Sequence, residues 1–90
     1  GGDEFAVMLL DTPLSVGREV LERARHAVDA EPLATEQGSV ALSVTIGATE
    51  RGDSTELAEL LERADAALYE AKDAGRNRVA VRWPEGSALA

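Results

Sequence analysis

The chain contains no cysteine, a single histidine and only one residue each of Phe, Tyr and Trp. Without cysteine it forms neither disulfides nor thiolate metal sites, which permits the reducing cytoplasm. His26 has no second His or Cys to complete a metal site, so we expect it on the surface. The longest apolar run, Phe5–Leu10, falls far short of the ~20 residues that a membrane-spanning helix needs. We therefore expect a cytoplasmic segment that makes no contact with a membrane.

Basic residues are also scarce, since nine Lys and Arg stand against 17 Asp and Glu and give a formal charge of −8. Nucleic-acid binding requires a broad basic face, so this balance argues against a nucleic-acid partner. Four of the nine basic residues nevertheless fall within eleven positions: Lys72, Arg76, Arg78 and Arg82. Such a local patch on an acidic protein suits a small anionic ligand better than a polymer.

Ninety residues leave room for one small unit and none for a second domain. The uninterrupted apolar run Phe5–Leu10 is typical of a strand covered on both faces. From about Pro13 to Ala30, apolar residues recur at helical spacing against a charged face, which predicts a helix. The segment Glu31–Ser39 contains a proline and a glycine and is predicted as a loop.

The second half of the chain repeats this alternation of strand and helix. Val40–Ile46 alternates strictly between large apolar and small side chains, which predicts a strand with one core face. A helix should follow, capped by Asp53 or Ser54 with Glu56 completing a capping box, and end at Gly75. A last short strand, residues 78–83, precedes a tail, residues 84–90, that we expect to be disordered.

The first residues offer a candidate site, since Gly1 and Gly2 stand directly before Asp3 and Glu4 and an apolar strand. Gly-Gly adopts the positive φ values of a tight hairpin turn and lets phosphates approach main-chain N–H groups. Carboxylates at the mouth of a buried strand suit Mg²⁺ or Mn²⁺, which prefer oxygen ligands and substrate phosphates. The alternative is an ordinary solvated turn.

Three motifs in order carry a family resemblance. Residues 1–5 read G-G-D-E-F, and residues 63–78 read R-A-D-A-A-L-Y-E-A-K-D-A-G-R-N-R. Between them, Leu42–Gly47 is similar to an S-[IV]-G strand but has Thr45 where Ser is usual. The chain thus resembles the C-terminal half of the catalytic domain of the GGDEF family, the diguanylate cyclases, over residues 1–83.

The resemblance implies an α/β (α+β) fold: a palm-like, ferredoxin-related mixed sheet with helices on one face, here incomplete as strand-helix-strand-helix-strand. It implies an enzyme that joins two GTP molecules into cyclic di-GMP, uses Mg²⁺ or Mn²⁺, and works as a homodimer. Asp3 would bind metal and act with Glu4 in catalysis, while Gly1 and Gly2 would shape the turn around the GTP phosphates.

Lys72 and Arg76 match the family positions that hold the β- and γ-phosphates of GTP. Four residues apart across a helix end, they can reach one anion from the same side. The alternative is that these cations only stabilise the negative end of the helix dipole. We expect Tyr69, Phe5 and Trp83 to be packing residues.

In the family, the glycine turn lies near the middle of the catalytic domain, and here it is at residue 1. The other half would carry a further metal-binding Asp and the guanine-recognising residues. We therefore expect a half-domain that is inactive alone. Two alternatives stay open: a degenerate, non-catalytic domain that binds nucleotide or cyclic di-GMP as a receptor, and an inert truncated fragment.

Overall fold

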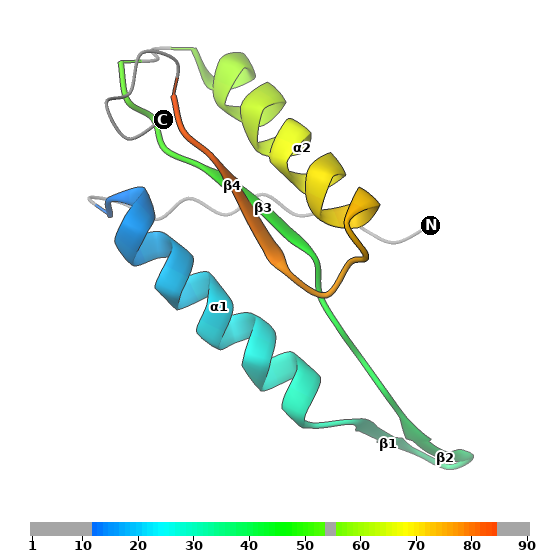
Figure 1. Cartoon of the computed structure of the whole chain (residues 1–90). Coiled ribbons are helices and arrows are strands. Elements are labelled where there is room, and N and C mark those ends of the chain that lie inside the picture. The colour runs from blue at the N-terminus through cyan, green and yellow to red at the C-terminus, as the bar shows by residue number, and fades with distance from the viewer. Residues whose placement is uncertain (1–11, 54–55, 85–90) are drawn as a thin grey trace.

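The computed structural model describes residues 12–53 and 56–84. The predicted strand Phe5–Leu10 and nearly all of the predicted tail lie outside these residues. The described chain forms two helices and two small two-stranded sheets. Figure 1 shows the larger sheet running between the two helices and the smaller one projecting beyond the end of the first helix. In chain order the elements are α1 (Leu14–Ala30), β1 (Leu33–Thr35), β2 (Gly38–Val40), β3 (Ile46–Thr49), α2 (Leu57–Asp73) and β4 (Val79–Arg82).

The centre of the described fold is a strand-helix-strand unit, in which α2 connects β3 to β4. The two strands are parallel, and their register runs from Ile46 opposite Val79 to Thr49 opposite Arg82. A parallel pair needs a crossover connection of a dozen or more residues, which the helix supplies. Helix α2 packs against both strands. Helix α2 approaches β3 closely at Gly47, where an added Cβ would lie 2.5 Å from the carbonyl oxygen of Ala64.

The two helices lie on opposite faces of the β3–β4 pair. On one face, Arg63 of α2 donates to the hydroxyl of Thr49, and Glu70 of α2 pairs with Arg82, the strand partner of Thr49. Successive strand residues point to opposite faces. In accord with this, the neighbouring Glu50 reaches α1, where its carboxylate accepts from the Leu14 N–H at 3.0 Å. The mixed α+β class is thus confirmed, whereas the expected placement of both helices on one face is wrong for the described residues.

The predicted strand Val40–Ile46 is also wrong in its position. Strand β2 ends at Val40, β3 begins at Ile46, and the residues between them belong to no strand. Figure 1 shows them as a long open link between the two sheets. An alternating pattern identifies side chains that share a face, but a strand also requires a neighbouring strand to pair with. The predicted loop Glu31–Ser39 is instead mostly the hairpin of β1 and β2.

The sequence predicted the C-terminal end of α2 correctly but not its N-terminal cap. At its start, Glu56 is the N-cap residue and makes no side-chain capping hydrogen bond, so the cap predicted at Asp53 is wrong. The alternative cap, Ser54, lies outside the described residues. At its end, Gly75 has φ 122° and its N–H bonds to the carbonyl oxygen of Lys72. The left-handed cap predicted at Gly75 is therefore confirmed. The predicted first helix and last strand are confirmed as α1 and β4, each within a residue or two of its expected bounds.

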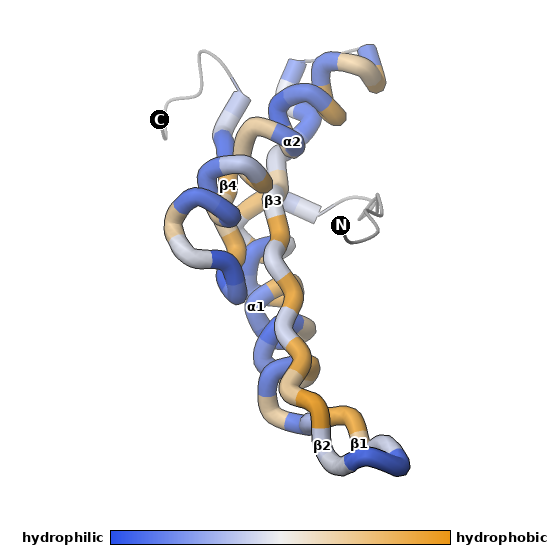
Figure 2. The backbone as a smooth tube through the Cα atoms, turned by 90° about the vertical axis from the view of Figure 1, so that its right-hand side faces the viewer, coloured by the Kyte–Doolittle hydropathy of each residue, from blue (hydrophilic) through white to orange (hydrophobic). Residues whose placement is uncertain are grey.

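Few described apolar side chains are buried. Those that are lie on α1, α2 and β4: Leu14, Ala67, Ala71 and Val79. Larger ones stay exposed, including Leu33 at 53% and Leu61 at 48%. Figure 2 shows a run of hydrophobic residues along the link from β2 into β3. No helix in residues 12–53 or 56–84 has the length and apolar character needed to cross a bilayer.

Candidate functional site

The C-terminal end of α2 carries a surface hollow of about 260 Å³ that brings two predicted site residues together. Lys72 and Arg76 both line it, along with Tyr69 and Asp73. Lys72 lies in the last turn of α2, whereas Arg76 follows the helix end. The hollow therefore presents an ammonium and a guanidinium group to one volume, with the Asp73 carboxylate at its edge.

Tyr69 departs from its predicted packing role, since it is 70% exposed. It precedes Lys72 by three residues and Arg76 by seven, so it lies on the same side of the helix end. Its ring is thus available as a wall of the hollow. Trp83, also predicted as a packing residue, is half-buried, and Phe5 lies outside the described residues. His26 is exposed on α1 as expected.

The backbone that presents Arg76 is unusual. Gly75, Arg76 and Asn77 have φ values of 122°, 62° and 48°, so three consecutive residues lie in the left-handed region. Glycine accepts this without penalty and Asn tolerates it, but Arg does not favour it. The Arg76 N–H is bound to the carbonyl oxygen of Ala71 at 3.0 Å, which closes the helix end. Contacts elsewhere must hold the turn against the backbone cost of about 1–2 kcal/mol per non-glycine residue.

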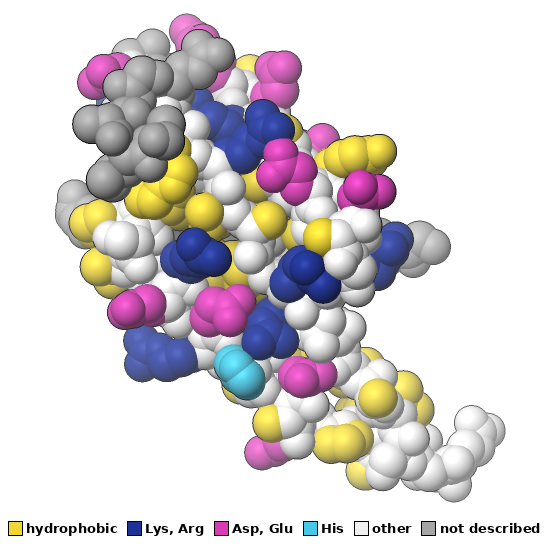
Figure 3. All heavy atoms as spheres, in the orientation of Figure 1, with side chains coloured by type: hydrophobic (Ala, Val, Ile, Leu, Met, Phe, Trp, Pro, Cys, Tyr) yellow, Lys and Arg dark blue, Asp and Glu magenta, His cyan; other side chains and the backbone are white. Residues whose placement is uncertain are grey.

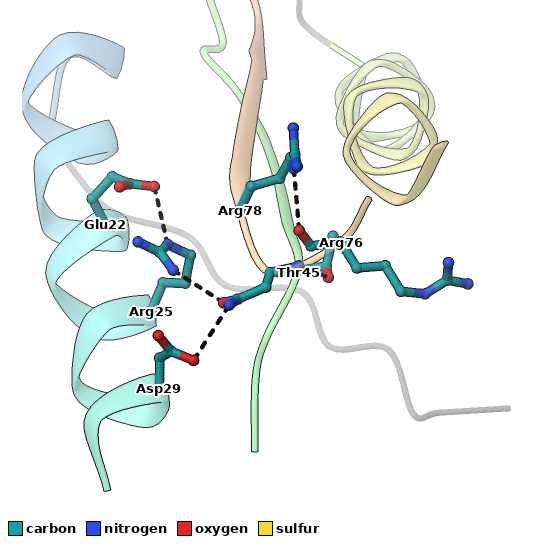
Figure 4. A network of polar contacts seen from close by, with 7 residues as sticks. Glu22, Arg25, Asp29, Thr45, Arg76 and Arg78 are labelled. Carbon is teal, nitrogen blue, oxygen red and sulfur yellow. Dashed lines mark hydrogen bonds and ion pairs between the residues drawn. The ribbon is translucent and has the colours of Figure 1, made fainter. Parts of the chain in front are cut away.

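Asn77 supplies those contacts. Its N–H donates to the Thr45 hydroxyl at 2.9 Å, and its side-chain oxygen accepts from Arg25 at 3.0 Å. Its side-chain nitrogen donates to Asp29 at 3.3 Å. Figure 4 shows this network on one side of the turn, with the Arg76 side chain extending away from it. Arg25 is held in turn by Glu22 on the same helix, and its side chain is only 13% exposed.

Arg78 and Arg82, the other two clustered basic residues, do not line the hollow. Arg78 donates from Nε to the carbonyl oxygen of Arg76 at 3.1 Å, and Arg82 forms an ion pair with Glu70. Figure 3 shows basic and acidic side chains interspersed on the visible face, with no continuous basic surface. The four basic residues that are close in sequence therefore do not form one patch. Lys72 and Arg76 are the two that line the hollow.

The predicted metal and turn residues, Gly1, Gly2, Asp3 and Glu4, lie outside the described residues. Within residues 12–53 and 56–84, no group of three or more His, Cys, Asp or Glu side chains is arranged to hold a metal ion. Sequence reasoning did not identify Arg25, Asp29 and Thr45 as the residues that hold Asn77 in this turn. A signal was present in the i,i+4 spacing of Arg25 and Asp29, which places both on one helix face.

Comparison with known proteins gives a consistent result. The family model described as "Diguanylate cyclase, GGDEF domain" matches residues 1–78. Diguanylate cyclase DgcP of Pseudomonas aeruginosa is 46% identical over 83 residues, which cover 90% of this chain and 12% of that protein. Diguanylate cyclase A of Treponema denticola is 40% identical over 80 residues, covering 88% of this chain and 22% of that protein.

A solved structure also resembles this fold. The GGDEF domain of DgcB from Caulobacter crescentus, in complex with c-di-GMP, superposes with a TM-score of 0.73 at 36% identity. The match covers 78% of this chain and 42% of that one. The chain therefore spans less than a quarter of the two curated relatives and less than half of the solved domain.

Proposed function

Because this chain belongs to the GGDEF-domain family of diguanylate cyclases, we propose that the protein containing it joins two GTP molecules into cyclic di-GMP and releases two pyrophosphates. The chain would supply one part of the catalytic domain, since it spans only a fraction of its relatives. The residues that recognise guanine and complete the metal site would come from the rest of the domain. We expect the 90-residue chain alone to be inactive for this reason.

Lys72 and Arg76 bind the β- and γ-phosphates of GTP in this proposal. The observation that carries it is the common hollow at the end of α2, which both side chains line. Lys acts there as a point charge and Arg as a fork that can hold two oxygens of one phosphate. Phosphoryl transfer depends mainly on positioning and on neutralising charge, which are the contributions that these two cations can make.

Asp3 would bind the divalent cation, and Glu4 would act beside it as the supporting catalytic acid. Their carboxylate oxygens are the donors that Mg²⁺ and Mn²⁺ prefer, so the chemistry of the residues fits either ion. The bound cation would stabilise the negative charge that grows as the phosphate is transferred. Gly1 and Gly2 let the backbone N–H groups of the turn approach the phosphates, because no Cβ stands in the way.

Two copies of the domain must meet, because each holds one GTP and the product contains two. We therefore propose a homodimer as the active form. Since GTP is a cytoplasmic substrate, we place the reaction in the cytoplasm. The unaltered sequence Gly1-Gly2-Asp3-Glu4-Phe5 favours catalysis over a receptor role, because the acids that catalysis needs are present.

A calorimetric GTP titration of the complete GGDEF domain containing this chain tests the phosphate assignment. Lys72→Ala and Arg76→Ala should each weaken GTP binding, with Arg76→Ala costing about 1.5–3 kcal/mol, the range for hydrogen bonds to charged groups. Arg23→Ala is the control, since it removes the same charge from an exposed position on α1. It should leave GTP affinity unchanged.

Denaturant unfolding of the same variants separates phosphate binding from helix stabilisation. If the two cations only complement the helix dipole, both alanine variants lose about 0.3–1 kcal/mol of stability and keep their GTP affinity. Unchanged affinity in both would end the phosphate assignment.

A further inference from the structure

The three left-handed residues after α2 are the most strained feature of the described backbone. A residue held in a sparsely populated conformation persists only when its surroundings impose it, and such residues concentrate at functional sites. Here Arg76 occupies that conformation at φ 62° and lines the hollow with Lys72. The contacts that hold the backbone of this turn therefore also determine where the Arg76 side chain starts, and so where its guanidinium group lies.

The described contacts trace this restraint to Asn77. Its backbone N–H is bound to Thr45, which immediately precedes β3, and its side chain bridges Arg25 and Asp29 on α1. These partners come from two segments that lie 32 to 52 residues away along the chain. Asn77, which directly follows Arg76, is thus bound both to the segment before β3 and to α1. Figure 4 shows Arg25 and Asp29 of α1 on one side of this turn.

We infer that Asn77 is a positioning residue, which together with Thr45, Arg25 and Asp29 directs Arg76 toward the bound phosphate. This rests on the proposed binding of GTP phosphates by Arg76. The Asn77 side chain contacts Arg25 and Asp29 of α1, and the Arg76 side chain extends away from α1 (Figure 4). Asn77 acts through the backbone between the two residues. A misplacement of about 1 Å in a catalytic group can cost on the order of 10²-fold in rate, so loss of this restraint is measurable.

Three variants of the complete GGDEF domain containing this chain test the inference. Asn77→Gly keeps the left-handed backbone accessible and removes both side-chain hydrogen bonds. Thr45→Val removes the hydroxyl that accepts from the Asn77 N–H, while Thr45→Ser keeps it. We expect Asn77→Gly and Thr45→Val each to weaken GTP binding about five- to tenfold, the loss of roughly one net hydrogen bond. Thr45→Ser should bind GTP as the unmodified domain does.

Combination with Arg76→Ala distinguishes positioning from general destabilisation. If Asn77 acts through Arg76, the double variant Asn77→Gly with Arg76→Ala binds GTP no more weakly than Arg76→Ala alone. Additive losses would overturn the positioning role, as would unchanged affinity in both Asn77→Gly and Thr45→Val. Should Asn77→Gly fail to fold, the Thr45 pair carries the same test. Unchanged affinity in Arg76→Ala itself would instead contradict the proposed function, so the two failures are distinguishable.

Discussion

The close contact between Gly47 and α2 predicts a severe effect of adding one methyl group. In Gly47→Ala, the new Cβ would lie 2.5 Å from the Ala64 carbonyl oxygen and 2.5 Å from the Leu68 Cα, with the Leu68 backbone nitrogen closer still. Ordinary contacts between nonbonded atoms lie at about 3.5–4.0 Å. The obstructing atoms belong to helix backbone and cannot rotate away, so α2 would have to move by about 1 Å.

The magnitude follows from what that movement disrupts. Helix α2 contributes Ala67 and Ala71, two of the few described apolar residues that are fully buried. Overpacking typically costs about 1–3 kcal/mol, and the rigid backbone at this contact places the cost at the upper end. Replacing Gly by Ala also restricts the unfolded chain, which stabilises by only about 0.4–1 kcal/mol. The overpacking cost is larger than this gain, and we expect a net loss of about 2–2.6 kcal/mol.

Urea unfolding of the complete domain, followed by circular dichroism, measures this loss. Gly38→Ala is the matched control, because a Cβ at Gly38 would meet nothing within 4 Å. It should cost only the backbone strain of its φ of 114°, about 1–2 kcal/mol. Helix α2 also carries Lys72, so any folded Gly47→Ala protein should bind GTP more weakly. Equal stability of Gly47→Ala and the unmodified domain would refute the packing argument.

Two further predictions concern the ends of elements and the core. Glu50→Ala should destabilise the complete domain by about 0.5–2 kcal/mol in urea melts, because it removes the carboxylate that accepts from the Leu14 N–H. Glu50→Gln keeps an acceptor and should lose only the charge interaction with the helix, about 0.3–1 kcal/mol; an Ala variant no less stable than the Gln variant would contradict this. The 90-residue chain by itself should aggregate or lack a cooperative transition, since large apolar side chains stay exposed. A sharp, reversible melt of a monomer in sedimentation and calorimetry would disprove it.

Sequence patterns predicted the two helices well, because the signals for a helix lie within the helix itself or directly beside it. Helix α1 has an apolar stripe at helical spacing, and α2 ends at Asp73, just before Gly75, which adopts φ 122° without strain. The same reasoning failed for strands. Whether Ala41–Thr45 joins a sheet depends on which strand lies beside it, and no local pattern encodes that partner.

Contacts between distant segments explain the other failures. The N-terminus of α1 follows Pro13 and has no side-chain cap of its own, and its first N–H is satisfied by Glu50 from 36 residues away. A capping search confined to adjacent residues cannot find such a partner. Likewise the motif indicated Lys72 and Arg76, but the ties that hold the turn come from α1 and the segment before β3.

Thr45 differs from the family pattern, which usually has Ser at this position, and the structure shows why the difference is tolerated. The Thr45 hydroxyl accepts from the Asn77 N–H at 2.9 Å. Both residues supply that oxygen, and the added methyl group suits the extended backbone that leads into β3. The interaction therefore depends on one atom that both residue types possess. The departure leaves the turn at Arg76 intact and does not weaken the case for phosphate binding there.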